Sequence, residues 1–125
     1  MRSSKNKMHP ILYKELNRMF VQLVRDIRTE EQAQGFVNDF FSEAEREIFT
    51  KRLAIFYWLK KGRSYSNIKQ NIKISSATIA STQNQMNKPG VKKILSLLEA
   101  EEWSNLWNAR IKKFINPHKI KYNKT

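Results

Sequence analysis

The side chains that could do chemistry are amides and hydroxyls gathered between residues 76 and 87. This segment has no charged residue, and its polar members are Ser76, Thr78, Ser81, Thr82, Gln83, Asn84, Gln85 and Asn87. Asn and Gln can pair with adenine, and the methyl groups of Ala and Thr pack on the thymine methyl. Arginine, the usual guanine reader, is absent from the segment. These residue types favour contacts with A·T-containing base edges, or contacts of low sequence stringency.

Helical periodicity selects the members of this segment that would face a ligand. Ile79 and Met86 are seven residues apart and share one helix face, which we expect to point inward. The candidate DNA-contacting residues on the segment are then Ser76, Ala77, Thr78, Ala80, Ser81 and Asn84. Flanking lysines would contact phosphates, and the candidates are Lys69, Lys73, Lys88 and Lys92. The alternative is an ordinary solvated helix face.

The charge distribution supports a polyanionic partner. The chain has 125 residues and a formal net charge of +13. No Asp or Glu occurs between residues 48 and 98, whereas that span contains ten Lys and Arg residues. Net charge is an argument about partners and solubility rather than about fold. A basic surface without a specific partner is the alternative that this composition leaves open.

Other classes of chemistry are disfavoured. Cysteine is absent, and His9 and His118 lie near the two ends, so no metal site is expected. The glutamates at 43, 45 and 47 spread around a helix instead of converging. No catalytic pair or glycine-rich phosphate loop is present, and we expect no enzyme. No apolar run reaches the roughly 18 residues that would span a membrane.

Helices must position these residues, and no alternating pattern predicts a sheet. Apolar residues recur every three or four positions over 12–27, which predicts an amphipathic helix after Pro10. Its apolar stripe needs a partner, which could be the same chain or a second subunit. Capping boxes at Thr29–Gln32 and Ser42–Glu45 predict two further helix starts. The helix from about 43 to 61 is apolar around much of its circumference, which predicts a buried central helix ending at Gly62.

Two short helices separated by Lys73-Ile74-Ser75 then predict a helix-turn-helix at residues 64–87, with Ser75 as the N-cap of its second helix. A last helix is expected from Gly90 to Phe114, because Asn116-Pro117 stops it. We therefore expect a disordered basic start at 1–9, one helical domain at 10–115, and a flexible basic tail at 116–125.

Several motifs resemble the tryptophan-repressor superfamily. They are Phe40 to Glu47 leading into Arg52-Leu53, then Leu59 to Ile68, then Ala77-Thr78-Ile79. Their order is most similar to the YerC/YecD-like branch, and the resemblance covers about residues 12–95. It implies an all-α, six-helix fold and an intertwined homodimer. Such a dimer would bind double-stranded DNA as a sequence-specific transcriptional regulator, and we expect it to act as a repressor. The bare stripe at 12–27 would then meet the partner.

The resemblance also implies an amino-acid site, which carries over poorly. In the family tryptophan lies between two arginines. Arg52 matches the first, but Ser81 stands at the second, and Ser42 replaces a threonine. Without that guanidinium a carboxylate loses its charge partner. We therefore expect no cofactor, and Arg52 and Ser42 remain candidates for a phosphate or ligand contact; Arg52 could instead form a surface ion pair with Glu45 or a neighbour. A further departure is Lys73, where the family has glycine in the turn.

Three interpretations follow from these residues. The first is a dimeric, cytoplasmic and nucleoid-associated regulator, with a tryptophan-responsive repressor as its variant. The second is a binder of DNA or RNA with low specificity and no regulatory ligand. The third is a protein-interaction module that uses the helix-turn-helix only for packing. No membrane association is expected.

Overall fold

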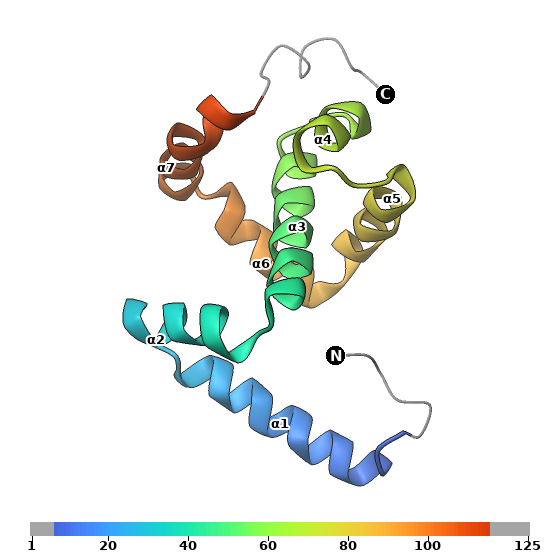
Figure 1. Ribbon diagram of the computed structural model, residues 1–125, viewed down its shortest axis with the longest axis vertical. Helices are drawn as coiled ribbons and strands as arrows, with labels where there is room; N and C mark the ends of the chain where they lie inside the picture. Colours follow the sequence, from blue (N-terminus) through green and yellow to red (C-terminus); the bar gives the residue numbers. More distant parts are fainter. Residues whose placement is uncertain (1–6, 116–125) are drawn as a thin grey trace. The chain divides into compact units, whose positions relative to one another are not determined.

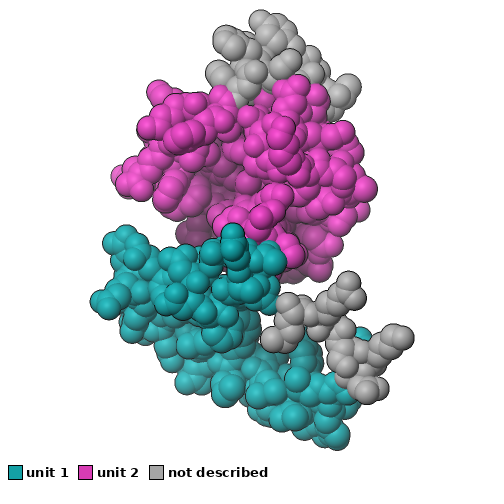
Figure 2. Space-filling view, viewed as in Figure 1, with its two compact units in different colours: residues 1–46 teal, residues 47–125 magenta. Residues whose placement is uncertain are grey.

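The computed structural model describes residues 7–115, and every regular element in this range is a helix (Figure 1). Seven α-helices occur among the described residues, together with one π-helical and two 3-10 segments. The chain divides into two compact units, residues 1–46 and residues 47–125 (Figure 2). The all-α prediction is confirmed for this range, whereas the expected number of six helices is not, because seven α-helices occur within it. Residues 1–6 and 116–125, where a disordered start and a flexible tail are expected, lie outside the described residues.

The first unit contains α1 (Pro10–Asp26), α2 (Glu30–Gly35) and the π-helical segment η1 (Phe36–Phe40). Proline occupies the first turn of α1, where its missing N–H leaves no hydrogen bond unmade. The Thr29 hydroxyl accepts from the Gln32 N–H at 3.1 Å, and the Gln32 amide oxygen accepts from the Thr29 N–H at 3.3 Å. The predicted capping box at the start of α2 is therefore confirmed.

Phenylalanine rings hold the first unit together. Phe36 stacks on Phe40 with centroids 5.3 Å apart, and Phe20 of α1 lies 6.1 Å from Phe36. Nevertheless, α1, α2 and η1 contain no fully buried residue. The apolar stripe of α1 remains exposed, and Met19 retains 65% of its accessible surface.

The helix α3 (Glu43–Lys60) begins at the second predicted capping box. The Ser42 hydroxyl accepts from the Glu45 N–H at 3.1 Å, and the Glu45 carboxylate accepts from the Ser42 N–H at 2.8 Å. The pKa of the Glu45 carboxyl is lowered from its ordinary value. The main cause is the hydrogen bond that the carboxylate accepts from the Ser42 backbone N–H, and the second is the interaction of the carboxylate with the Ser42 side chain. Gly62 follows the helix with φ +80°, the left-handed conformation expected of a C′ glycine.

The second unit has a hydrophobic core around the C-terminal half of α3. The other helices that supply it are α4 (Tyr65–Ile72), α5 (Ser76–Asn84) and α6 (Pro89–Glu99). Its buried members are Ile55, Tyr57, Trp58, Ile68, Ile79, Leu95 and Leu98. In contrast, Ile48, Phe49 and Leu53 on the first half of α3 are exposed. The prediction of a buried central helix therefore holds only for the second half of α3.

The last predicted helix is divided in two. The structure has α6 ending at Glu99 and α7 (Glu101–Ile111) beginning two residues later, with a 3-10 turn η3 (Lys112–Phe114) after it. Ala100 interrupts the helix with φ −55° and ψ 128°. Contacts of α3 accompany the break: the Lys60 ammonium lies 2.5 Å from the Glu99 carboxylate, and the Tyr57 hydroxyl donates to Asn108 Oδ1 at 2.6 Å. The single helix from Gly90 to Phe114 was thus a wrong prediction.

Candidate nucleic-acid interface

The helix-turn-helix begins with a well-capped α4. The Ser64 hydroxyl accepts from the Asn67 N–H at 3.1 Å, which satisfies one of the free amides of the first turn. Ile68 is completely buried and fixes the inner face of α4 against the core. Lys69, one position later, is exposed. The core contact of Ile68 therefore directs Lys69 toward solvent.

The turn keeps the backbone that a glycine would adopt, although its residue is Lys73. This lysine has φ 48° and ψ 66°, which is left-handed, and it is the sole non-glycine residue with positive φ among residues 7–115. Its N–H donates to the Lys69 carbonyl at 3.1 Å, which closes the end of α4. The departure from the family pattern thus changes the residue and leaves the turn geometry in place.

The helix α5 starts at the predicted N-cap. The Ser75 hydroxyl accepts from the Thr78 N–H at 3.1 Å and lies 2.9 Å from the Thr78 hydroxyl. Ile79 is fully buried and Thr82 is buried, so one face of α5 belongs to the core. The opposite face must then be presented to solvent.

Most of the predicted base-contacting residues are on this solvent face. Ser76, Ala77, Thr78, Ser81 and Asn84 are exposed. Ala80 is half-buried. The exposed surface of α5 carries hydroxyl, amide and methyl groups and no charge, as its sequence predicts. Whether these groups contact bases stays a prediction.

One polar side chain of α5 has a partner that the sequence pattern did not indicate. The Tyr65 hydroxyl donates to the Gln83 amide oxygen, and so connects the first turn of α4 to the last turn of α5. The two residues are 18 positions apart, and neither periodicity nor spacing pairs a tyrosine with one particular glutamine. The bond fixes the Gln83 amide, whereas the Asn84 side chain beside it is exposed to solvent.

The predicted phosphate-contacting lysines border this face. Lys69 lies on the last turn of α4, Lys73 in the turn, Lys88 at the start of α6, and Lys92 in the first turn of α6. All four are exposed. Within residues 7–115 the ion pairs of the second unit are Lys51–Glu47 and Lys60–Glu99, and neither includes these lysines. Their positive charge is therefore available to a ligand.

A polar pocket of about 400 Å³ lies behind α5, between it and α3. Its lining residues are Arg52, Phe56, Ser81, Thr82, Gln85, Lys88 and Val91. The structure thus brings Arg52 and Ser81 to one pocket, as the family resemblance implies. The Arg52 guanidinium lies 5.7 Å from the centre of the Phe49 ring and makes no ion pair with a described carboxylate. Two cations, Arg52 and Lys88, and the hydroxyls of Ser81 and Thr82 give this pocket a preference for an anionic group.

Ser42, the other candidate for a ligand contact, belongs to the first unit. Its hydroxyl and N–H form the capping box of α3 with Glu45. This capping role is sufficient to explain the residue locally, and a ligand contact stays a prediction.

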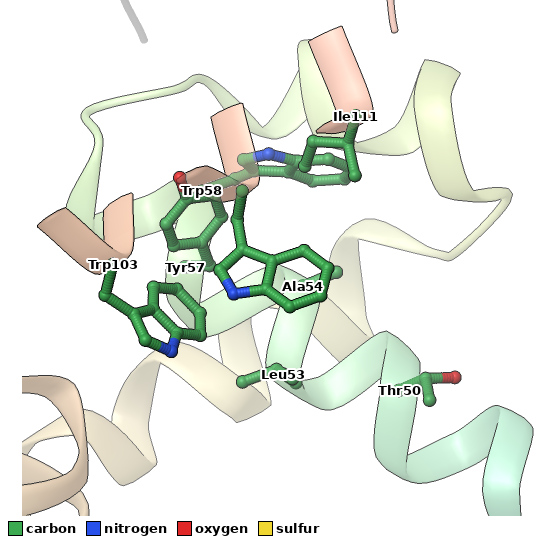
Figure 3. A pocket seen from close by; sticks show the side chains of 8 residues that line it. Thr50, Leu53, Ala54, Tyr57, Trp58, Trp103 and Ile111 are labelled. Atoms are coloured by element: carbon green, nitrogen blue, oxygen red, sulfur yellow. The ribbon is translucent and has the colours of Figure 1, made fainter. Parts of the chain in front are cut away.

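A second pocket of about 220 Å³, between α3 and α7, is apolar (Figure 3). Its lining residues are Thr50, Leu53, Ala54, Tyr57, Trp58, Trp103, Trp107 and Ile111. The rings of Trp103 and Trp107 have centroids 6.0 Å apart, and the two tryptophans lie on the same face of α7. With no charged side chain in its wall, this pocket does not suit a phosphate.

The described residues contain no group of three His, Asp or Glu side chains that could hold a metal ion. None of the helices within residues 7–115 is long and apolar enough to cross a membrane.

Comparison with known proteins places these features in a family. The family described as Trp repressor protein has a sequence model that matches residues 15–102. This range includes α4, the turn and α5. No curated protein and no solved structure matches the chain. The finer assignment to the YerC/YecD-like branch stays a prediction.

Proposed function

The chain belongs to the Trp repressor family, and from this premise we propose that it is a DNA-binding transcriptional regulator, a repressor that acts as a homodimer. The observation that carries the proposal is the solvent face of α5. It presents Ser76, Ala77, Ser81 and Asn84 without charge, between exposed lysines that no described carboxylate neutralises. The regulator would act in the cytoplasm, on the nucleoid.

Sequence would be read by α5 in the major groove. Asn84 is the exposed amide on this face, and an amide can bond bidentately to adenine N6 and N7. Ala77 and Thr78 offer methyl groups for the thymine methyl. The proposed binding site is therefore rich in A·T pairs at the positions that α5 contacts.

Affinity would come chiefly from phosphates. Lys69 on α4, Lys73 in the turn and Lys88 at the start of α6 lie before and after α5 in the chain, and each would release a counterion on binding a phosphate of duplex DNA. Each phosphate contact steepens the dependence of log K on log salt concentration by about 0.9 for B-DNA. Three contacts per chain, doubled in a dimer, would give a slope of about −5.

A tryptophan-responsive repressor is the second candidate, because the polar pocket holds Arg52 in the matching place. Ser81 in the same wall offers a hydroxyl where the family has a guanidinium. A hydroxyl cannot supply the flat, charged partner that holds a carboxylate. We therefore favour a regulator without this effector, and Arg52 as a phosphate contact.

Selection of bound sequences from a random duplex pool, with and without added amino acids, tests the proposal. We expect one enriched palindrome, whose half-site spacing reports the separation of two α5 helices in the dimer. Enrichment only with tryptophan would favour the second candidate.

Competition with RNA addresses the low-specificity alternative. A regulator should prefer its selected duplex over RNA of equal length by orders of magnitude. Equal competition by RNA, or no enriched sequence at all, would contradict the proposal. Loss of all nucleic-acid binding with a stable dimer would instead point to a protein-interaction module.

A further inference from the structure

A second basic region lies at the C-terminal end of the second unit. From Trp103 to the end of the sequence there is no Asp or Glu, and the same stretch has six Lys and Arg residues. Three of these, Arg110, Lys112 and Lys113, belong to the described end of α7 and to η3. None of the three is needed for the proposed reading of DNA by α5.

Two cations of this region, Arg110 and Lys113, lie over aromatic rings rather than against carboxylates. The Arg110 guanidinium lies 5.0 Å from the centre of the Trp107 ring, and the Lys113 ammonium lies 5.3 Å from that of Phe114. No ion pair among the described residues involves Arg110, Lys112 or Lys113. A guanidinium stacked on an indole loses little hydration and keeps its N–H edges for an anion.

The segment is nevertheless held to the core. Ile111 and Ile115 are half-buried and pack against the hydrophobic cluster. Lys112 and Lys113 between them, and Arg110 immediately before Ile111, are exposed. Two apolar anchors therefore fix a short turn whose charged side chains face solvent.

This region is separated from the helix-turn-helix. In Figure 1, α5 and α7 lie on opposite sides of α3, which runs between them. A duplex in contact with the outer face of α5 therefore lies on the side of α3 away from α7. The cations of α7 and η3 would have to meet a different anion.

We propose that the end of α7 and η3 is a second, sequence-independent contact for duplex DNA, which binds the phosphates of a segment other than the one read by α5. Only the binding of the first DNA segment by α5 rests on the proposed function; the contact made by α7 and η3 does not. The charge favours a polyphosphate, because three adjacent exposed cations have no acidic partner among the described residues. The aromatics favour a duplex over a single strand: from Trp103 to Ile115, the described part of this stretch, Phe114 is the one open ring at 76% exposure, whereas Trp103 and Trp107 are half-buried. One ring is too few to stack successive bases.

A capture experiment tests the second contact. A duplex with the selected site is immobilised and saturated with the full chain, and a labelled duplex without the site is added. We expect the Arg110→Gln, Lys112→Gln, Lys113→Gln variant to lower capture of the labelled duplex at least about tenfold, while the Kd for the selected site changes less than about twofold. The salt dependence of capture should become shallower by nearly three in log–log slope.

A charge-matched variant serves as the control. Lys7→Gln, Lys14→Gln, Arg28→Gln removes the same charge from exposed positions of the first unit, and its capture should stay within twofold of the wild type. Undiminished capture by the α7 variant would overturn the proposal, because two α5 helices of a dimer would then suffice to bridge the duplexes. Stronger displacement by single-stranded DNA than by duplex would overturn it as well.

Failure of the proposed function can be distinguished from failure of this inference. The Lys69→Gln, Lys73→Gln, Lys88→Gln variant removes the lysines around α5, and its binding to a random duplex is measured by fluorescence anisotropy. We expect this variant to retain salt-dependent duplex binding that the added α7 substitutions abolish. This result would support the second contact even if no selected site existed, and absence of residual binding would contradict it.

Discussion

Lys73 carries two properties that act in opposite directions. Its left-handed backbone costs an L-residue about 1–2 kcal/mol. Its exposed ammonium lies between α4 and α5, where a DNA phosphate would approach an α5 placed in the major groove. A cation therefore lies in this turn at a backbone conformation that favours glycine.

Substitution of Lys73 should separate these two properties. Lys73→Gly removes the conformational cost, and because glycine loses roughly 0.5–1 kcal/mol more entropy on folding, we expect a net stabilisation of about 0.5–1 kcal/mol. Urea unfolding should show a higher midpoint with an unchanged m value. Lys73→Ala is the matched control: it loses the same charge but keeps the strain. Both variants should show a salt slope shallower by about 0.9 per chain, and equal stability of the two would contradict the strain argument.

Asn84 and Lys69 should differ in what they contribute to DNA binding. Asn84→Ala should lower affinity for the selected site by about 1–3 kcal/mol and relax the preference at one base pair. Lys69→Ala should weaken binding to all duplexes alike and make the salt slope shallower. Anisotropy with the selected duplex and with single-base variants measures both effects. A uniform loss for Asn84→Ala would remove it from the base-contacting set.

At the scale of helices, local signals predicted starts and turns well. The capping boxes at Thr29 and Ser42, the N-cap at Ser75 and the glycine at 62 are all in the predicted places, because each acts through neighbours within four residues. The break at Ala100 was missed. The residues around it are helix formers without Pro or Gly, and the break accompanies contacts with α3 from 39 or more residues away.

The candidate site was predictable to a similar degree. Periodicity placed Ile79 inward and Asn84 outward, and the structure agrees. The Tyr65–Gln83 bond and the burial of Thr82 depend on how α4 crosses α5, which no repeat in the sequence encodes. The limited burial of α3 was missed for a related reason: apolar periodicity does not say whether an apolar face meets the same chain.

The position of α7 on α3 depends on one buried hydroxyl. Tyr57 is 5% exposed, and its hydroxyl bonds to Asn108 Oδ1 at 2.6 Å and to the Ser104 carbonyl at 3.2 Å. Tyr57→Phe leaves Asn108 without this donor, and we expect it to lower the free energy of unfolding by about 1–3 kcal/mol. Thermal or urea unfolding measures the change. Tyr65→Phe, which removes a more exposed hydroxyl, is the control and should lower the free energy of unfolding by less. An equal decrease in the two variants would contradict the inference that the Tyr57 hydrogen bonds hold α7 on α3.

At the scale of the whole molecule, each unit leaves apolar surface uncovered. The 17 residues of α1 include none that is buried, and Leu12, Leu16, Met19 and Leu23 are exposed along it. Most of the stability of an amphipathic helix in a protein comes from packing of its apolar face. The second unit separately exposes Ile48, Phe49 and Leu53 at the start of α3. Contiguous apolar surface of this kind is typical of a protein interface, and a second copy of the chain is the partner that the proposed function requires.

Charge placed on the apolar stripe of α1 should therefore prevent dimer formation. We expect Leu16→Glu with Met19→Glu to raise the dimer dissociation constant at least about a hundredfold, because two buried apolar contacts of roughly 1.5–3 kcal/mol each would be replaced by desolvated carboxylates. Sedimentation velocity over a range of concentrations measures the association. Asn17→Glu with Gln22→Glu adds the same charge at exposed polar positions of α1 and should leave the dimer intact.

A monomeric variant should also lose affinity for the palindrome while still binding one half-site weakly, since only one α5 then contacts the DNA. A wild-type chain that sediments as a monomer at all concentrations would contradict the homodimer directly.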